Sequence, residues 1–316
     1  MIKEFRPDLS TTLTIGSDSY GFLPHPVLAG EVQKMVREQT TIYQLIRQAD
    51  STLWALKVMN VGSHRDQQNT RLTAAALTPY KHLPGLFVAN RLPLTKALYP
   101  ELIAAYPALK DATLMPWITG KSWADFMSDP LASAYYTRPQ AIDLAVSMAR
   151  TLWNLENHQS AHTDIAGENV IVLATNKIEL IDIEGIYIPG LPPPPQRSRG
   201  WQGYQHRFLD QRGNYRPDGD RFAGAILLSE MLTWWNPLVR ALTPDEYDAL
   251  FQFRQQEPPA QLERRIRAVR GVLWSISPDL CGLFDQAWSS SDLAQCPNFA
   301  TWMVYLLEAK LAALGG

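Results

Sequence analysis

The sequence is poor in cysteine, in net charge and in long apolar runs. Its 316 residues include two cysteines, Cys281 and Cys296, too few for a disulfide framework. Lys and Arg total 29 against 31 Asp and Glu, a formal net charge of −2, so charge gives no reason to expect nucleic acid or an anionic membrane as a partner. No run approaches transmembrane length, and the first residues lack the apolar stretch of a signal peptide. We therefore expect a soluble, cytoplasmic, globular protein with no nucleic-acid or membrane partner.

The apolar content is sufficient for a sizeable core, since 46% of the residues are hydrophobic and 19% are charged. The length predicts about two domains, or one domain of two lobes. Residues 41–47 and 52–59 are short runs of β-branched, aromatic and aliphatic residues around a polar segment, which predicts a β-hairpin. Residues 65–77 predict a helix, and two further strands are expected at 86–89 and 112–115.

The rest of the chain has mostly helical patterns. Apolar residues recur near a 3.6-residue period over 139–158, and the segments 222–232 and 299–311 are similar. The segment 189–195, PGLPPPP, is too rich in proline for a helix or a sheet interior and predicts an extended loop. These patterns predict an α+β protein with a small strand-rich lobe over 1–116 and a larger, mostly helical lobe over 117–316.

Four polar residues in the second lobe stand in a register that indicates phosphoryl-transfer chemistry. His162-x-Asp164 is followed by Asn169, and Asp182 closes a short apolar strand. This pattern resembles the catalytic loop and the metal-binding D-F-G segment of the protein kinase superfamily. The resemblance is to a divergent, bacterial-type Ser/Thr protein kinase, and it extends over nearly the whole chain. Trp54–Lys57 resembles the strand V-A-I-K, Met115–Gly120 resembles the hinge that reads adenine, and Gly203-Tyr204 and Asp220 match later kinase segments.

The resemblance implies a two-lobe protein-kinase-like fold that binds ATP and Mg²⁺. It implies a role for Asp164 in accepting the proton of the attacking hydroxyl, for Lys57 in holding the nucleotide phosphates, and for Asn169 and Asp182 as oxygen ligands of magnesium. The implied catalytic residues are Asp164, Lys57 and Asn169. The implied nucleotide-binding residues are Ala55, Lys57, Met115, Pro116, Trp117, Ile118, Asn169 and Asp182.

Several features of the kinase pattern are absent. The segment 34–40, where a phosphate-covering loop would lie, contains no glycine, so its backbone cannot approach phosphate in the usual way. No Glu occurs between Glu38 and Glu101, so Lys57 lacks the helix glutamate that active kinases need. The candidates for a substitute partner are Glu31, Glu38, Asp66 and Glu184. In the later segments, Phe208 and Cys296 replace both halves of an ion pair that anchors the kinase activation segment.

Three functions remain open on the sequence alone. The first is an ATP- and Mg²⁺-dependent kinase that transfers the γ-phosphate to Ser or Thr of a protein substrate. The second is a pseudokinase, in which the same fold serves as a binding or allosteric module for a regulatory protein partner. The third is a small-molecule kinase of the aminoglycoside-phosphotransferase type. The sequence leaves the oligomeric state open, and the proline-rich loop fits either a stiff spacer or a ligand for an aromatic groove.

Overall fold

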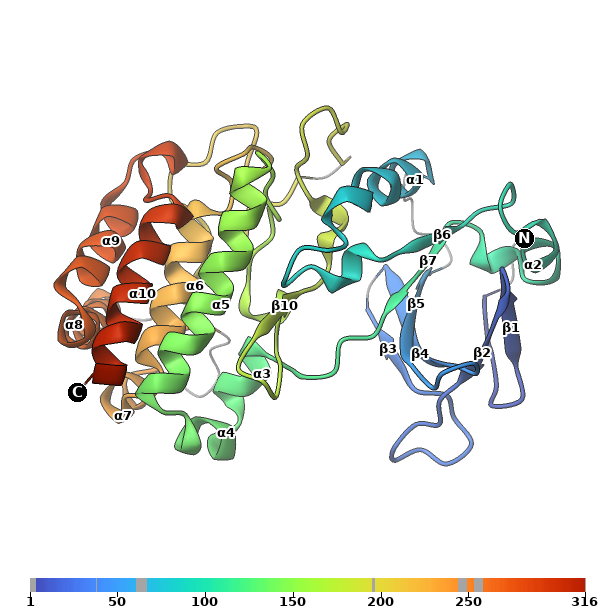
Figure 1. Ribbon diagram of the computed structural model, residues 1–316, viewed down its shortest axis with the longest axis horizontal. Helices are drawn as coiled ribbons and strands as arrows, with labels where there is room; N and C mark the ends of the chain where they lie inside the picture. Colours follow the sequence, from blue (N-terminus) through green and yellow to red (C-terminus); the bar gives the residue numbers. More distant parts are fainter. Residues whose placement is uncertain are drawn as a thin grey trace. The chain divides into compact units, whose positions relative to one another are not determined.

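The computed structural model describes residues 4–37, 39–60, 67–194, 197–243, 249–252 and 258–315. The protein is α+β, with an antiparallel sheet that curls and a set of packed helices (Figure 1). The chain divides into two compact units. Unit 1 comprises Met1–His82 and Phe87–Ile118, and unit 2 comprises Leu83–Leu86 and Thr119–Gly316.

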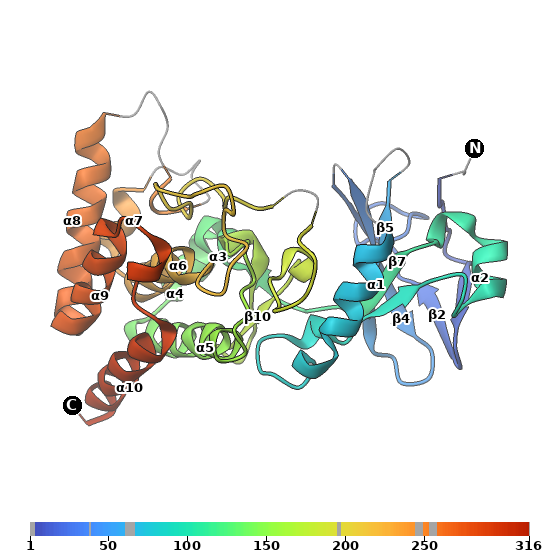
Figure 2. The ribbon, with the colours of Figure 1, turned by 90° about the horizontal axis from the view of Figure 1, so that it is seen from above.

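Unit 1 is built on one antiparallel sheet whose strands follow the order β1-β2-β4-β5-β7-β6, with β3 paired to β4. Figure 2 labels β2, β4, β5 and β7 of this sheet. The strands are β1 (Thr12–Ile15), β2 (Asp18–Phe22), β3 (Lys34–Val36), β4 (Thr40–Arg47), β5 (Leu53–Met59), β6 (Leu92–Leu94) and β7 (Ala112–Pro116). Its helices are α1 (Gln67–Ala76), α2 (Pro100–Ala105) and the 3₁₀ turns η1 (Thr78–Tyr80), η2 (Phe87–Ala89) and η3 (Pro107–Leu109).

The hairpin predicted over 41–59 is confirmed by β4 and β5. The turn between them is stabilised by Asp50, which accepts hydrogen bonds from the backbone N–H and the hydroxyl of Thr52 and pairs with Arg47. Side chains that alternate along β4, β5 and β7 contribute to the core of unit 1, including Tyr43, Leu56 and Leu114. The predicted helix at 65–77 and strand at 112–115 correspond to α1 and β7, with residues 65 and 66 outside the described part of the chain.

The strand predicted at 86–89 is wrong. The segment forms the 3₁₀ turn η2, and the nearby strand is β6, three residues further along. Gly85 has φ +81°, and this left-handed residue turns the chain directly before the apolar run. A four-residue apolar run does not by itself distinguish a strand from a short helix. Pro93 can lie in β6 because β6 is an edge strand of the sheet.

Unit 2 is mainly helical, with a small antiparallel sheet in the order β10-β9-β8. Its strands are β8 (Lys121–Ser122), β9 (Val170–Val172) and β10 (Ile178–Leu180). Its helices are α3 (Trp123–Ser128), α4 (Pro130–Tyr135), α5 (Arg138–Asn157), α6 (Arg221–Thr233), α7 (Pro237–Ala241), α8 (Pro259–Ile276), α9 (Pro278–Ser289) and α10 (Phe299–Gly315). The 3₁₀ turns are η4 (Gly167–Asn169), η5 (Ile183–Gly185) and η6 (Leu293–Gln295).

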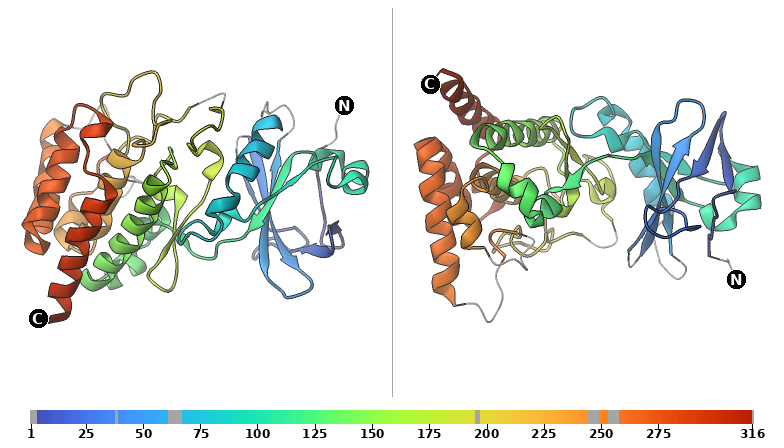
Figure 3. Two further views of the ribbon diagram at one scale, coloured as in Figure 1. Left: turned by 45° about the horizontal axis from the view of Figure 1, so that its top comes forward. Right: turned by 90° about the horizontal axis from the view of Figure 1, so that it is seen from below.

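The predicted helices at 139–158, 222–232 and 299–311 are confirmed by α5, α6 and α10. Helix α5 packs against both α6 and α10 (Figure 3). Every residue of α6 from Phe222 to Thr233 is buried, which makes α6 the centre of unit 2. None of the helices in the described part of the chain has the length and hydropathy needed to span a bilayer.

A long irregular segment connects η5 to α6. It begins at Tyr187, whose backbone forms a bridge with Ala161, and it has no regular structure over 191–194, as expected of the proline-rich loop. Pro195 and Gln196 lie outside the described residues. This segment returns to the loop at 162–169 through Ser198, which brings it to the candidate site.

Candidate functional site

The loop at 162–169 is fixed to the start of α6 by Asp220. One carboxylate oxygen of Asp220 accepts the backbone N–H of His162 at 2.6 Å, and the other accepts that of Thr163 at 2.7 Å. Burial raises the pKa of Asp220 to about 6, partly offset by the nearby His162 and these two N–H groups. The most buried helix of unit 2 therefore sets the position of this loop.

Thr163 lies in the left-handed region of the backbone, with φ +72°. This conformation is rare for a β-branched residue, and three groups hold it in place. Its N–H donates to Asp220, its hydroxyl donates to the Gly185 carbonyl at 2.8 Å, and its carbonyl accepts from the Asn214 side chain at 3.1 Å. The strained residue thus links α6, η5 and the irregular segment directly beside Asp164.

The His162 ring connects the loop to the end of β10. Its Nε2 lies 2.8 Å from the carbonyl oxygen of Ile181, and its Nδ1 accepts the backbone N–H of Asp164 at 3.3 Å. Because a carbonyl oxygen can only accept, Nε2 carries the proton and donates it. The ring is fully buried and acts as a brace between Asp164 and Ile181.

Asp164, Asn169 and Asp182 come together through this loop and the β9–β10 hairpin. Val170 pairs with Leu180 in the hairpin, and the Ile181 N–H donates to the Asn169 carbonyl at 2.9 Å. Asp182 directly follows Ile181, the residue that is hydrogen-bonded to Asn169. The Asn169 side-chain nitrogen donates to the Asp164 carbonyl at 2.8 Å and lies 3.4 Å from the Asp164 carboxylate. The Asn169 side chain therefore contacts Asp164, and the backbone pairing of the hairpin places Asp182 one residue beyond the partner of Asn169. We refer to Asp164, Asn169 and Asp182 below as the Asp164 cluster.

The donor set of this cluster fits magnesium. Because the amide nitrogen of Asn169 donates to Asp164, the amide oxygen is the atom left to meet a cation, and the Asp182 side chain is exposed. The described residues contain no group of three or more His, Cys, Asp and Glu side chains that could enclose a metal by themselves. Magnesium is commonly held by one or two protein oxygens together with substrate phosphates, so two oxygen donors suit a metal that arrives with a nucleotide.

Ser198 from the irregular segment contacts the predicted base. Its hydroxyl donates to Asp164 Oδ1 at 2.7 Å and accepts the Gly200 N–H at 3.0 Å. Neither Ser198 nor Asn214 was among the predicted site residues. Their contacts to the loop at 162–169 join positions more than thirty residues apart, and no spacing rule in the sequence indicates them.

In unit 1, three of the predicted nucleotide-binding residues lie on one face of the sheet. Ala55 is paired with Met115, and Lys57 is paired with Thr113. Residues directly opposite on antiparallel strands share a face, and the neighbouring residues Leu56 and Leu114 point to the other face, into the core. Lys57 is 9% exposed, so the strand holds an amino group at a buried position.

The segment after Met115 leads out of the sheet. Pro116 ends β7, the Trp117 N–H donates to the Leu53 carbonyl at 3.1 Å, and Ile118 is the last residue of unit 1. A buried cation that was not predicted, Arg91, approaches Met115, with its guanidinium 3.8 Å from the Met115 sulfur. Arg91 stands outside any strand or helix, and therefore no periodic pattern could indicate it.

The segment expected to cover phosphate lies in the β3–β4 hairpin. Arg37 and Thr40 close its turn with a hydrogen bond of 2.8 Å, while Glu38 lies outside the described residues. Of the other acids suggested for Lys57, Glu31 pairs with Lys34 at 3.9 Å and Asp66 lies outside the described residues. Glu184 belongs to unit 2, in the 3₁₀ turn η5 that follows Asp182.

Phe208 and Cys296, the two positions expected from the kinase resemblance to carry a loop-anchoring ion pair, lie near a cluster of polar groups around Ser290 and His206. Phe208 is 64% exposed, whereas Cys296 is buried. Ser290 lies 3.0 Å from His206 Nε2 and 3.1 Å from the Cys296 sulfur, and the Phe208 N–H donates to His206 Nδ1. Burial lowers the pKa of His206, which favours its neutral form.

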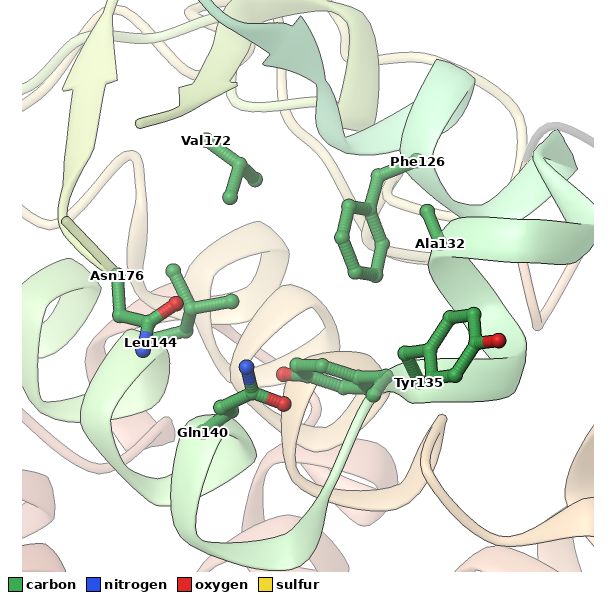
Figure 4. Close-up of a pocket in the computed structure, with 8 residues that line it drawn as sticks. Phe126, Ala132, Tyr135, Gln140, Leu144, Val172 and Asn176 are labelled. Atoms are coloured by element: carbon green, nitrogen blue, oxygen red, sulfur yellow. The ribbon is translucent and has the colours of Figure 1, made fainter. Parts of the chain in front are cut away.

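A separate cavity of about 230 Å³ lies between α3, α4, α5 and the β9–β10 turn (Figure 4). Its lining is mostly aromatic and aliphatic and includes Phe126, Ala132, Tyr135, Tyr136, Gln140, Leu144, Val172 and Asn176. No predicted site residue is in this lining, so the cavity is distinct from the Asp164 cluster.

Comparison with models of known protein families gives no match, and comparison with curated proteins gives none either.

Proposed function

We propose that the chain is a divergent ATP- and Mg²⁺-dependent protein kinase that transfers the γ-phosphate to a Ser or Thr hydroxyl. The observation that carries this proposal is the cluster of Asp164, Asn169 and Asp182, held by His162 and by the carboxylate of Asp220. Phosphoryl transfer depends mainly on positioning and on neutralising charge. A rigid carboxylate beside two oxygen donors supplies both requirements.

Each residue has a distinct task in this mechanism. Asp164 accepts the proton of the attacking hydroxyl, and the amide of Asn169 keeps its carboxylate in position. Asn169 and Asp182 would hold magnesium, which when bound neutralises charge on the nucleotide phosphates. Lys57, a point charge at a buried position of β5, holds the phosphate tail, while the segment from Met115 to Ile118, at and after the end of β7, receives the adenine.

The Ser198 contact supports a Ser or Thr acceptor. A serine hydroxyl already reaches Asp164 Oδ1 at 2.7 Å, within the range required for proton transfer to a general base. A short aliphatic hydroxyl therefore fits the space beside the base.

The pseudokinase alternative is favoured by two residues that unit 1 lacks, a glycine in the β3–β4 hairpin and a glutamate in α1. The β3–β4 hairpin offers no glycine for a close approach to phosphate, and α1, which spans Gln67–Ala76, contains no glutamate for Lys57. In that case the chain is a binding or allosteric module for a protein partner.

Calorimetric titration of ATP with and without magnesium tests the proposal. We expect magnesium-dependent binding by the wild type and an affinity at least about tenfold lower for Asp182→Ala, a loss of about 1.4 kcal/mol. Glu308→Ala is the matched control, because Glu308 is an exposed acid on α10, and we expect it to bind like the wild type. Absence of magnesium-dependent binding by the wild type at millimolar ATP would reject the kinase and leave the pseudokinase.

A further inference from the structure

The irregular segment that reaches the predicted base carries positive charge. Between Glu184 and Asp210 the sequence contains three arginines, Arg197, Arg199 and Arg207, and no Lys, Asp or Glu. All three arginines are exposed. We call these three residues the arginine patch. It is locally positive in a chain whose formal net charge is −2.

Uncharged groups hold the three guanidinium groups in place. Two of the guanidinium groups lie over aromatic rings, and the third donates to a backbone carbonyl. The contacts are those of Arg197 with the Tyr215 ring, 6.0 Å from its centre, of Arg207 with the Trp288 ring, 5.0 Å from its centre, and of Arg199 with the Leu209 oxygen, at 3.3 Å. The side chains are therefore positioned while their charge stays available to a ligand.

The arginines that follow in the sequence differ in this respect, because each of them is paired with a carboxylate. The pairs are Arg212 with Asp210, Arg216 with Asp218, and Arg221 with Glu156. No member of the arginine patch forms an ion pair within the described part of the chain. Stabilisation by ion pairs thus accounts for the later arginines and does not account for the arginine patch.

The arginine patch lies beside the predicted base. Ser198, which stands between Arg197 and Arg199, donates its hydroxyl proton to Asp164 Oδ1 at 2.7 Å. The Arg199 guanidinium contacts the backbone two residues beyond Arg207. A peptide that brings its own hydroxyl to Asp164 therefore places its neighbouring residues close to these arginines. A guanidinium group binds a carboxylate through two parallel hydrogen bonds, so acidic residues next to the acceptor hydroxyl fit this surface.

We propose that the arginine patch binds acidic peptide segments, and that the substrates of the chain carry Asp or Glu next to the acceptor Ser or Thr. This inference rests on the proposed function, because it names the substrate class of the same site. Proteins that bind nucleic acid commonly make about 6–10 phosphate contacts. Three arginines suit a short acidic segment better than they suit a nucleic acid.

Direct binding to the full chain is the first test. The probes are three fluorescent peptides, each with one serine, identical except that the residues on both sides of the serine are glutamate, glutamine or lysine. Fluorescence anisotropy gives the three affinities. We expect the glutamate peptide to bind most tightly and the lysine peptide most weakly. The preference should decrease as salt is added, because exposed charges are screened.

Variants of the arginine patch separate its charge from a structural role. With Arg197, Arg199 and Arg207 all replaced by glutamine, the glutamate peptide should bind roughly tenfold more weakly, the sum of three exposed charge pairs, and the glutamine peptide should bind as before. Replacing all three by glutamate should invert the preference in favour of the lysine peptide, which a structural role would not do. Arg267→Gln is the matched control, because Arg267 is an exposed arginine on α8, and it should bind like the wild type.

Steady-state transfer to the same peptides is the second test. For the glutamate peptide, the triple glutamine variant should have a KM roughly tenfold higher and an unchanged kcat, since the arginine patch binds the peptide and takes no part in the transfer. Its affinity for ATP should equal that of the wild type. A loss of ATP affinity as large as the loss of peptide affinity would assign the arginines to the nucleotide phosphates and overturn the inference.

The outcomes distinguish the inference from the proposed function. Equal affinity of the wild type for the three peptides, or tighter binding of a single-stranded oligonucleotide than of the glutamate peptide at the same ionic strength, overturns the inference and leaves magnesium-dependent ATP binding as it is. Arginine-dependent binding of the glutamate peptide without magnesium-dependent ATP binding rejects the kinase. In that case the binding surface is upheld, as the site where a pseudokinase holds an acidic segment of its partner.

Discussion

Thr163 has a strained backbone conformation, and its side-chain hydroxyl makes a hydrogen bond from that conformation. Its φ of +72° costs an L-residue roughly 1–2 kcal/mol, and the hydroxyl that donates to Gly185 offsets part of this cost. We predict that Thr163→Val lowers the free energy of unfolding by about 1–2 kcal/mol, since it keeps the branched shape and loses the donor. Thr163→Ser keeps the donor and removes the branch, so it should be neutral or slightly stabilising. Urea denaturation of the two variants makes the comparison, and equal stabilities would contradict it.

At the scale of single residues, the sequence indicated the site residues that follow a motif spacing. It did not indicate the contacts that join segments far apart in the sequence. Asp164, Asn169 and Asp182 could be selected because only a loop and a hairpin separate them along the chain. In the structure Asn169 contacts Asp164, and the β9–β10 pairing places Asp182 just beyond the partner of Asn169. The contact of Ser198 with Asp164 and that of Arg91 with Met115 could not be predicted. Each residue reaches its partner, Asp164 or Met115, from a distant segment without a periodic pattern, so their positions depend on the whole fold.

Helix α6 makes the stability of unit 2 depend on pH through Glu230. This fully buried carboxylate accepts hydrogen bonds from the Leu250 N–H, the Tyr204 hydroxyl and the Trp123 indole. Burial raises its pKa from 4.5 to about 7, against the effect of those three donors. The folded state therefore holds a proton that the unfolded chain releases. The stabilisation from this group is complete below pH 4.5 and is lost as the pH rises to about 7.

We predict that Glu230→Gln removes this dependence. Between the two pKa values, 4.5 and about 7, the free energy of unfolding of the wild type should fall relative to the variant by on the order of 3 kcal/mol. The glutamine amide can still accept from the Leu250 N–H and donate to the Tyr204 hydroxyl, so the variant should fold. It loses the hydrogen bond from the Trp123 indole, because an amide nitrogen cannot accept it, and this cost does not depend on pH. Urea denaturation across this pH range provides both curves, and His206, whose lowered pKa acts in the opposite direction, cancels in their difference. A constant difference between the curves would show that Glu230 does not titrate in this range.

Helices with a long periodic pattern of apolar residues were predicted well from the sequence. Helices α5 and α10 extend over many turns and were confirmed, whereas the short run at 86–89 was wrongly assigned as a strand. The hairpin of β1 and β2 was not predicted, although the sequence carries a signal for it. Gly16 and Ser17 alone separate the two strands, and Gly16 has φ +65°, as two-residue hairpin turns require.

At the scale of the whole molecule, the chain does not divide at a single point. Leu83–Leu86 belongs to unit 2, although the residues on both sides of it belong to unit 1. The Gly85 carbonyl accepts the Leu180 N–H at 2.8 Å, and Leu86 is fully buried. A segment of four residues in the first third of the sequence is therefore part of the core of unit 2, and composition along the chain could not reveal this.

Adding a single methyl group at Gly85, within Leu83–Leu86, should lower the stability of unit 2. A Cβ on Gly85 would lie 2.1 Å from the Thr151 hydroxyl oxygen on α5. That hydroxyl cannot rotate away without loss, because it donates to the Ser147 and Pro84 carbonyls at 3.1 and 3.4 Å. Gly85 also has φ +81°, so the cost of overpacking, about 1–3 kcal/mol, adds to that of the left-handed backbone.

Gly190 provides the matched control, since it lies in the same unit with φ +82° and has no atom within 4 Å of the position that a Cβ would take. We predict that Gly190→Ala costs roughly 1–2 kcal/mol, the backbone contribution alone, and that Gly85→Ala costs about 1–3 kcal/mol more. Tryptophan fluorescence during urea denaturation reports mainly on unit 2, because of the ten tryptophans only Trp54 and Trp117 lie in unit 1. If the two variants unfold at the same urea concentration, Leu83–Leu86 is not part of the unit 2 core, and the two units would instead divide at a single point near Ile118.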